Sequence, residues 1–373
     1  MDVNEKTVCK NCADISLGRY IYKYGEKGEC SYCGRKDVFV MQIDRILKRI
    51  SVAIDFYYES PENYPSLQGW NYYAEDIIED DDLELTEAND TFLNDLKLAV
   101  RHDDRIWIRK RDLWTPFSDA LKSSWDNFSE IVKHQWRYTY FLCGNSIDDP
   151  ATYSPLDTLD IICEIIKSRS ELITELPALT SIFRARKCEK KTEISAKALG
   201  SAPIKYAGSN RFSPEGISMF YGSLDKETPV KEADGDSNSV ILGEFYNSKS
   251  IKLLDLTHIP EVPKLYDDDY VFIPPLNFLH KFAETISKKN NSKNSIEYIP
   301  TQVFTEYIRF QGLRKLNIKG IKYNSAQNEG GINLVLFYTN DDCIDETDHN
   351  NENDCLVLRS FTTTQTEPIK END

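Results

Sequence analysis

The stretch from Asn210 to Ala233, NRFSPEGISMFYGSLDKETPVKEA, contains three side chains suited to chemistry on a charged ligand. Arg211 offers a planar guanidinium that can bind two phosphate oxygens at once. Tyr221, at the end of an apolar run that reads as a strand, offers a face for a flat ring. Glu232 offers a carboxylate that favours positive charge developing beside it in a dry site. The same residues would also suit a surface ion pair and a half-buried strand aromatic, so both interpretations stay open here.

A second chemically capable group lies near the N-terminus, where two C-x2-C pairs are separated by 17 residues: Cys9, Cys12, Cys30 and Cys33. This spacing is typical of a zinc site in which two short turns place four thiolates on one tetrahedral ion. Gly34 follows the second pair, where a tight turn would need a residue that tolerates positive φ. Because the segment offers no fifth ligand, we expect a structural zinc whose binding contributes to the folding of residues 1–39.

The segment 40–175 is expected to be helical, because its apolar residues recur at spacings of three and four. The pattern predicts helices over 41–59, 90–102, 125–142 and 154–169, the last one starting at a Ser-Pro pair. In the third of these, Trp136 belongs to the apolar stripe. Residues 75–90 contain nine acids and no base, which predicts a solvated loop.

From residue 176 onward the pattern changes to short runs rich in Val, Ile, Leu and aromatic residues, which predict strands. These runs cover 239–247, 251–257, 320–325, 332–339 and 355–361, with a helix over 301–316. We therefore predict an α+β protein with three parts: a zinc-ribbon-like segment (1–39), a helical domain (40–175) and a mixed α/β domain (176–373).

The composition narrows the possible functions. The net charge of −16 disfavours non-specific binding of nucleic acid. We find no apolar run of about 18 residues and no apolar signal-peptide core, so we expect a cytoplasmic protein with reduced thiols and no membrane partner. The sequence also lacks the phosphate-loop, dinucleotide-fingerprint, nucleophile-elbow and H-E-x-x-H motifs.

The C-terminal region resembles the RES family, which is named for its arginine, glutamate and serine. Four stretches carry the resemblance: FRAR (183–186), NRFSPEGISMFYGS (210–223), KETPVKEA (226–233) and IKYNSAQNEGGINLVLF (321–337). Two positions depart from the family pattern, Asn210 in place of a common glycine and Ser213 in place of a common asparagine. The resemblance implies an ADP-ribosyltransferase-like fold, in which a split sheet surrounds a cleft for a nicotinamide dinucleotide.

The resemblance also implies roles for individual residues. The expected catalytic residues are Glu232, Arg211, Tyr221 and Ser325. The residues expected to bind NAD are Arg184, Arg211, Tyr221, Gln302 and Ser325, with Tyr298 beside Gln302 as a supporting residue. In these roles the arginines would bind the pyrophosphate, Tyr221 the nicotinamide ring, and Glu232 the ribose on which positive charge develops.

The cysteine pairs followed by helices resemble the HEPN-like domain that is often fused to RES domains, through CSYCG (30–34) and EIVKHQWRYTYF (130–141). Many HEPN proteins are ribonucleases with an Arg-x4–6-His motif on one helix, and none of the five histidines here has such an arginine. Glu130, His134 and Arg137 would share a helical face at spacings of four and seven. We expect this region to sense, restrain or oligomerise the RES domain.

These observations lead to an NAD-consuming enzyme that cleaves the nicotinamide–ribose bond, as a glycohydrolase or a phosphorylase, and acts as a bacterial toxin or phage-defence effector. The alternatives are an ADP-ribosyltransferase that modifies a protein target, a nucleotide-binding adaptor without turnover, and a HEPN-type ribonuclease. The expected cofactor is structural zinc, with NAD as substrate. The expected partners are a separate antitoxin or regulatory protein and further copies of the chain in a homo-oligomer.

Overall fold

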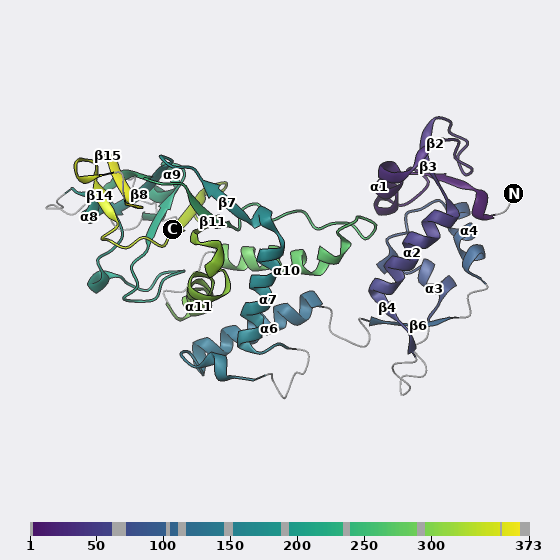
Figure 1. Ribbon diagram of the computed structural model, residues 1–373, viewed down its shortest axis with the longest axis horizontal. Coiled ribbons are helices and arrows are strands. Elements are labelled where there is room, and N and C mark those ends of the chain that lie inside the picture. Colours follow the sequence, from purple (N-terminus) through teal and green to yellow (C-terminus); the bar gives the residue numbers. More distant parts are fainter. Residues whose placement is uncertain are drawn as a thin grey trace, which may run out of the picture. The chain divides into compact units, whose positions relative to one another are not determined.

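The computed structural model describes residues 3–61, 72–101, 105–110, 117–144, 152–187, 194–233, 239–288, 295–350 and 353–365. Contacts between residues divide the chain into two compact units (Figure 1). The N-terminal unit comprises Met1–Ala120 with Glu261–Asn277, and the C-terminal unit comprises Leu121–Pro260 with Phe278–Asp373. The boundaries that the sequence suggests near residues 39 and 175 concern family domains rather than these units, and they stay predictions.

The cysteine-bearing part of the N-terminal unit is built on a small antiparallel sheet. Its strands pair in the order β1 (Thr7–Cys9), β3 (Val38–Gln42) and β2 (Glu26–Gly28). Helix α1 (Ile15–Tyr24) follows the first cysteine pair, and the side chain of Asp14 accepts a hydrogen bond from the Ser16 amide. This cap satisfies an amide that the first helical turn leaves unpaired, which lets the helix begin directly after the cysteine turn.

Amphipathic helices form most of the remaining N-terminal unit. They are α2 (Ile43–Tyr57), α3 (Ala74–Ile78) and α4 (Asp90–Val100), accompanied by the short strands β4 (Tyr58–Glu59), β5 (Tyr72–Tyr73) and β6 (Ile106–Arg109). The predicted helices over 41–59 and 90–102 are confirmed by α2 and α4. The predicted solvated loop over 75–90 is wrong, because this stretch contains most of α3 and its apolar side chains Ile77, Ile78, Leu83 and Leu85 are buried. The acidic residues of this stretch are interspersed with apolar residues whose side chains pack in the core of the N-terminal unit.

A segment from the C-terminal half of the sequence completes the core of the N-terminal unit. Leu265 and Tyr266 are buried in the same apolar cluster as Cys9, Cys12 and Cys30. The hydroxyl of Tyr266 donates to the carbonyl of Leu83 at 2.7 Å. The N-terminal unit is therefore assembled from two separate parts of the chain.

The helices that follow α4 in the chain lie wholly or mainly in the C-terminal unit. These include α6 (Phe117–His134), α7 (Pro155–Ser168), α8 (Ala196–Leu199), α9 (Glu227–Ala233), α10 (Ile273–Ser287) and α11 (Ile299–Tyr307), the last of which continues into a π-helical turn (Ile308–Gly312). Helix α7 begins as predicted, with Ser154 as its cap and Pro155 in its first turn. Helix α6 ends at His134, so Trp136 lies outside it and is exposed. The prediction that Trp136 belongs to an apolar helical stripe is therefore wrong.

Nine strands of this unit form one mixed sheet in the order β14-β15-β10-β8-β9-β13-β12-β11-β7. Their bounds are β7 (Ile173–Leu176), β8 (Ser181–Lys187), β9 (Phe220–Ser223), β10 (Ser239–Asn247), β11 (Ile251–Asp255), β12 (Ile318–Asn324), β13 (Ile332–Leu336), β14 (Cys343–Asp345) and β15 (Leu356–Gln365). Strands β8 and β9 oppose each other only at Phe183 and Ser223, whereas β8 and β10 are paired from Ser181 to Lys187. The sheet is therefore split between β8 and β9, which agrees with the predicted α+β class and its split sheet.

The predicted strands are all present, and β10 has the predicted bounds. The predicted helix over 301–316 is formed by α11, the π-helical turn and a 3-10 turn. Among the described residues, none of the helices combines the length and the apolar character needed to cross a membrane.

Candidate functional site

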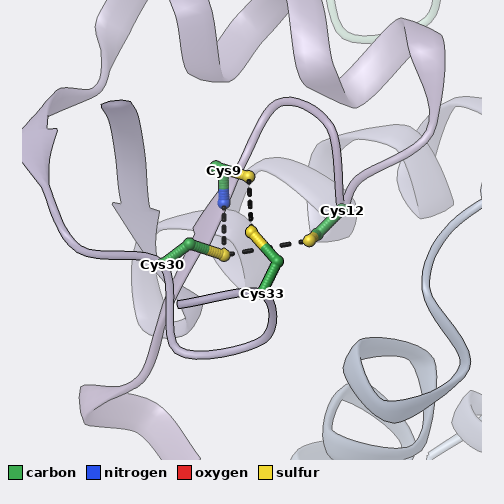
Figure 2. A group of neighbouring side chains, drawn as sticks. All are labelled: Cys9, Cys12, Cys30 and Cys33. Carbon is green, nitrogen blue, oxygen red and sulfur yellow. Dashed lines mark hydrogen bonds between the residues drawn. The ribbon is translucent and has the colours of Figure 1, made fainter. Parts of the chain in front are cut away.

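The four cysteines of the two C-x2-C pairs converge at one point in the N-terminal unit (Figure 2). Their sulfur atoms all lie within 4.8 Å of one another. The Sγ atoms of Cys9 and Cys33 are 3.7 Å apart, and those of Cys12 and Cys30 are 3.8 Å apart. Gly34 has φ +67°, which confirms the predicted turn after the second pair.

The sulfur spacing fits a tetrahedral metal ion. With zinc–sulfur bonds of about 2.3 Å, tetrahedral geometry places the sulfurs about 3.8 Å apart. Cys9, Cys12 and Cys30 are buried, and the amide of Cys9 donates to the Cys30 sulfur at 3.3 Å. A cluster of four thiols in this arrangement could hold a metal ion. Since all four positions of a tetrahedron are taken by protein, such an ion would have a structural role.

In the C-terminal unit, an arginine side chain bridges the split in the sheet. Arg184 of β8 donates from Nη1 to the carbonyl oxygen of Tyr221 in β9 at 2.5 Å, and its guanidinium lies 5.4 Å from the centre of the Phe220 ring. Burial, and after it the charge of Arg186, lower the pKa of Arg184 to about 9. Among the described residues, no carboxylate forms an ion pair with Arg184. A bound anion would therefore stabilise its charged form.

The hydroxyl of Tyr221 fixes the turn that carries Arg211. This hydroxyl accepts a hydrogen bond from the Phe212 amide at 3.2 Å and shares another with Ser213 Oγ at 2.9 Å. Burial raises the pKa of Tyr221 to about 12, so the hydroxyl stays protonated at ordinary pH. Tyr221 is the second residue of β9, and the prediction that its strand ends there is wrong. The strand begins after the turn instead, so the tyrosine can reach back to that turn.

The side chain of Arg211 lies at the C-terminal end of α10. Its guanidinium donates to the carbonyl oxygens of Ile286 and Lys288, the latter at 2.8 Å, and lies 5.9 Å from the centre of the Tyr323 ring. Helix carbonyls that lack an intrahelical partner attract a cation at this position. In the part of the chain that the structure describes, Arg211 has no carboxylate partner. Two backbone carbonyls use two of its five N–H donors, which leaves donors for a ligand.

The side chain of Gln302, in α11, forms hydrogen bonds with the loop that precedes Arg211. Its buried amide nitrogen donates to Ser209 Oγ at 2.9 Å and to the Asn210 carbonyl at 2.7 Å, with a longer contact to the Ser213 carbonyl at 3.3 Å. The predicted role of Gln302 in binding NAD stays a prediction. Its contacts in this structure are those of a residue that positions the Arg211 loop.

Glu232 and Ser325 are in direct contact although they are 93 residues apart. Ser325 Oγ donates to Glu232 Oε1 at 2.8 Å. Asn333 of β13 also donates to this oxygen through Nδ2, while its Oδ1 accepts from Ser223 Oγ at 2.7 Å. Ser325 further accepts from the amides of the following turn, so it has both a turn role and a contact with the carboxylate. The carboxylate of Glu232 is exposed, and two donors fix one of its oxygens.

Asn333 is a site residue that the sequence reasoning missed. Its signal in the sequence is a single amide within the apolar run INLVLF. Tyr323 of β12 was missed as well. It is buried, and its ring packs against Phe212 with ring centres 4.8 Å apart.

Tyr323 connects the two halves of the candidate site. Burial raises its pKa, and the charge of Glu232 raises it further, whereas the charge of Arg211 lowers it. The charges of Tyr221 and Tyr298 raise the pKa of Tyr323 as well. Tyr323 also lies opposite Asn333 in the pairing of β12 with β13, and its ring lies beside Phe212 and the Arg211 guanidinium. One buried tyrosine thus lies next to the Arg211 loop and next to Asn333, which binds Glu232, and Arg184 contacts Tyr221.

Two cavities open beside this group. One has a volume of about 530 Å³ and is lined by Asn324 and Ala326, on either side of Ser325, and by residues of α10 including His280 and Glu284. The other has a volume of about 300 Å³ and is lined by Arg211, Tyr298 and Thr301 together with residues of α6. Lys288 lines both. Their volumes lie within or near the range of small-ligand sites, about 300–1,000 Å³.

The residues considered for ribonuclease activity are placed differently from the prediction. Arg137 lies beyond the end of α6, so it does not share a helical face with Glu130 and His134. Its guanidinium donates to the carbonyls of Val132 and Lys133, at 3.3 and 3.0 Å. Arg137 therefore caps the helix end, and these contacts offer no support for a nuclease site.

Family comparison agrees with this architecture. The model of the HEPN/RES N-terminal domain 1 matches residues 23–146, and the model of the RES domain matches residues 181–357. No curated protein matches the chain. The first match ends within the segment between α6 and α7, and the second covers the split sheet from β8 into β15. The chain is thus a RES-domain protein that carries a HEPN/RES N-terminal domain.

Proposed function

We propose that this protein cleaves the nicotinamide–ribose bond of NAD. The observation that carries the proposal is that Tyr323 lies beside the Arg211 loop and opposite Asn333, the residue that binds Glu232. On one side lie Arg211 and Arg184, the latter in contact with Tyr221. Neither arginine has a carboxylate partner among the described residues. On the other side, Ser325 and Asn333 hold the Glu232 carboxylate. An anionic dinucleotide with a reactive ribose suits both sets of groups.

In the proposed reaction, the arginines would bind the substrate and Glu232 would stabilise the charge that develops on it. Arg184 and Arg211 would bind the pyrophosphate, whose charge relieves the cost of two partly buried guanidiniums. The departure of nicotinamide leaves positive charge on the ribose. A carboxylate that is already fixed by two donors stabilises such charge without having to reorganise. In the complex with NAD, the hydroxyl of Ser325 and a ribose hydroxyl would both donate hydrogen bonds to the carboxylate oxygens of Glu232.

The acceptor of the ADP-ribose group determines the reaction class. Water would make the protein a glycohydrolase, inorganic phosphate would make it a phosphorylase, and a protein side chain would make it an ADP-ribosyltransferase. In a cell, NAD consumption would make the protein a toxin or a defence effector, which a separate antitoxin or regulatory protein would have to restrain. We also propose zinc as the ion of the four-cysteine site, since four thiolates at tetrahedral spacing suit it.

A direct test incubates the purified full-length chain with NAD, with and without inorganic phosphate, and identifies the products by mass spectrometry. We expect nicotinamide to be released, and we expect Glu232→Ala to abolish the release. Glu227→Ala is the matched control, because Glu227 is an exposed glutamate of the same helix, α9. NAD that stays intact with the wild-type protein, or a Glu232→Ala variant as active as wild type, would contradict the proposal. Binding of NAD without any product would indicate the adaptor function instead.

A further inference from the structure

The smaller of the two cavities beside the candidate site has walls from both matched domains. Trp125, Asp126, Ser129 and Lys133 belong to α6, within the HEPN/RES N-terminal match. Arg211, Tyr298 and Thr301 belong to the RES match. All of these residues lie in the C-terminal compact unit. Helix α6 is therefore part of the structure around Arg211, although its family match belongs to the N-terminal domain.

Aromatic packing holds α6 in this position. Trp125 is 6% exposed, and its ring centre lies 4.8 Å from that of Phe282 in α10 and 6.3 Å from that of Phe304 in α11. Phe128, one turn later, is fully buried. Burial of two large aromatic side chains anchors the helix, so the residues of its cavity-facing side have defined positions.

Lys133 is the cation that α6 contributes to the cavity. Its side chain is 12% exposed, and Nζ lies 2.7 Å from Glu130 Oε1 and 3.5 Å from Glu297 Oε2. The hydrogen bond with Glu130 raises the pKa of Lys133, so the ammonium is charged. An ammonium has three N–H donors, and these two carboxylates account for two of them.

An anionic ligand would find a cation in this cavity that no acid neutralises. The lining contains three cations, Lys133, Arg211 and Lys288, and two acids, Asp126 and Glu297, while Glu130 pairs with Lys133 from outside the lining. Arg211 contacts backbone carbonyls rather than a carboxylate, so its charge is not neutralised by an acid within the described structure. A phosphate placed here could accept from the ammonium and the guanidinium together.

We propose that Lys133 binds a phosphate of the dinucleotide in this cavity, so that the HEPN/RES N-terminal domain supplies part of the RES substrate site. The proposal rests on the proposed function and assigns to α6 a role in substrate binding. It differs from the expectation that the helical region only senses, restrains or oligomerises the RES domain. It also means that a chain without α6 would lack one of the cations that recognise the substrate.

The test measures binding of ADP-ribose and of inorganic pyrophosphate to the full-length chain by isothermal titration calorimetry. We expect Lys133→Met to weaken both affinities about 10-fold, the loss typical of one charge-assisted hydrogen bond, and Lys133→Arg to retain most of the affinity. Lys167→Met is the matched control, because Lys167 is an exposed lysine of α7 that pairs with Glu164 three residues earlier, as Lys133 pairs with Glu130, and it is not among the residues that line either cavity. We expect this control to bind as wild type does. Circular dichroism and thermal melting would verify that all variants are folded.

The outcomes separate this inference from the proposed function. If wild type consumes NAD and Lys133→Met binds ADP-ribose as tightly as Lys167→Met, the role of Lys133 is refuted while the reaction stands. If wild type binds ADP-ribose through Lys133 but leaves NAD intact, the phosphate site stands and the reaction is refuted. If wild type does neither, both proposals are refuted.

Discussion

Replacing Asn333 with aspartate changes one donor of the site without changing its shape. Asn333 is 3% exposed and donates to Glu232 while accepting from Ser223. In Asn333→Asp, the new carboxyl group can still accept from Ser223 Oγ, so the contact that supports its position is kept. Toward Glu232, however, an N–H donor is replaced by an oxygen. The substitution therefore tests the Glu232 contact more directly than a truncation does.

The expected size of the effect follows from the contact. Loss of a hydrogen bond to a charged group costs about 1.5–3 kcal/mol, which corresponds to roughly a 10- to 100-fold loss of kcat/KM for Asn333→Ala. In Asn333→Asp, two carboxylates would face each other at about 3 Å. At an effective dielectric constant of about 20, their repulsion would be about 5 kcal/mol, so the pair would retain a proton up to a strongly raised pKa. Above that pKa, at about pH 9, where both groups are ionised, we expect a larger loss than for Asn333→Ala.

The retained proton gives the variant its own pH dependence. The repulsion raises a carboxyl pKa, and the protonated form predominates below that raised value. A protonated carboxyl group can again donate to Glu232 as the amide does. The activity of Asn333→Asp relative to wild type should therefore recover as the pH falls. The assay is kcat/KM for NAD cleavage between about pH 5 and pH 9, in wild type and in both variants.

A matched control carries the same change of charge outside the site. Asn317→Asp is suitable, because Asn317 is exposed and has φ +52°, a conformation that aspartate also tolerates. We expect this control to follow the wild-type profile. An Asn333→Asp variant with wild-type kcat/KM at about pH 9, or one whose relative activity falls as the pH is lowered, would refute the reasoning.

The purified chain should contain one zinc ion per molecule, and Cys12→Ser should lose the ion and the folded N-terminal unit, measured by elemental analysis and circular dichroism; melting that a chelator leaves unchanged would contradict this expectation. Tyr266→Phe leaves the buried Leu83 carbonyl without its donor and should lower the free energy of unfolding by about 1–2 kcal/mol in urea titrations. Equal stability of the two proteins would refute that contact. Because the pKa of Tyr221 is raised to about 12, its phenol is neutral below that value, and kcat/KM should show no loss from its ionisation between about pH 8 and pH 10. Tyr221→Phe should lower kcat/KM by releasing the Arg211 turn, and a variant with full activity would contradict this role.

The sequence predicts best those features that local patterns encode. The C-x2-C spacing predicts the four-cysteine cluster, because each pair needs only one short turn and the two turns meet on a small sheet. Strand β10 has its predicted bounds because a run rich in Val, Ile, Leu and aromatic residues pairs with a neighbouring strand on each side. Ser154 and Pro155 mark the start of α7 for a similarly local reason. In each case, neighbours in the sequence decide the conformation.

The features that local patterns miss depend on distant contacts. Asn333 reads as a polar exception in an apolar strand, and only the approach of α9 gives its amide a carboxylate to bind. The many acids of residues 75–90 make this stretch look like a solvated loop, although Leu83 and Leu85 are buried. They are buried because a segment about 180 residues later in the chain completes the core around them. Helix α6 looks like any amphipathic helix, and its sequence does not indicate that Lys133 lies in a cavity beside Arg211.

The split in the sheet explains why the polar residues gather where they do. Between β8 and β9 the regular ladder is reduced to one opposed pair, so backbone groups there need other partners. Arg184 donates a hydrogen bond to the carbonyl of Tyr221. On β9, the side chain of Ser223 donates to Asn333, and Asn333 donates to Glu232. Under the proposed function, the groups beside the broken ladder would also be the ones that face the ligand. A change at Arg184 or Asn333 should therefore alter stability as well as activity, whereas Glu232→Gln keeps an oxygen that can accept from Asn333 and removes the charge, so it should affect activity more than stability. The ratio of these two effects separates residues that mainly support the split from the residue that we propose acts on the substrate.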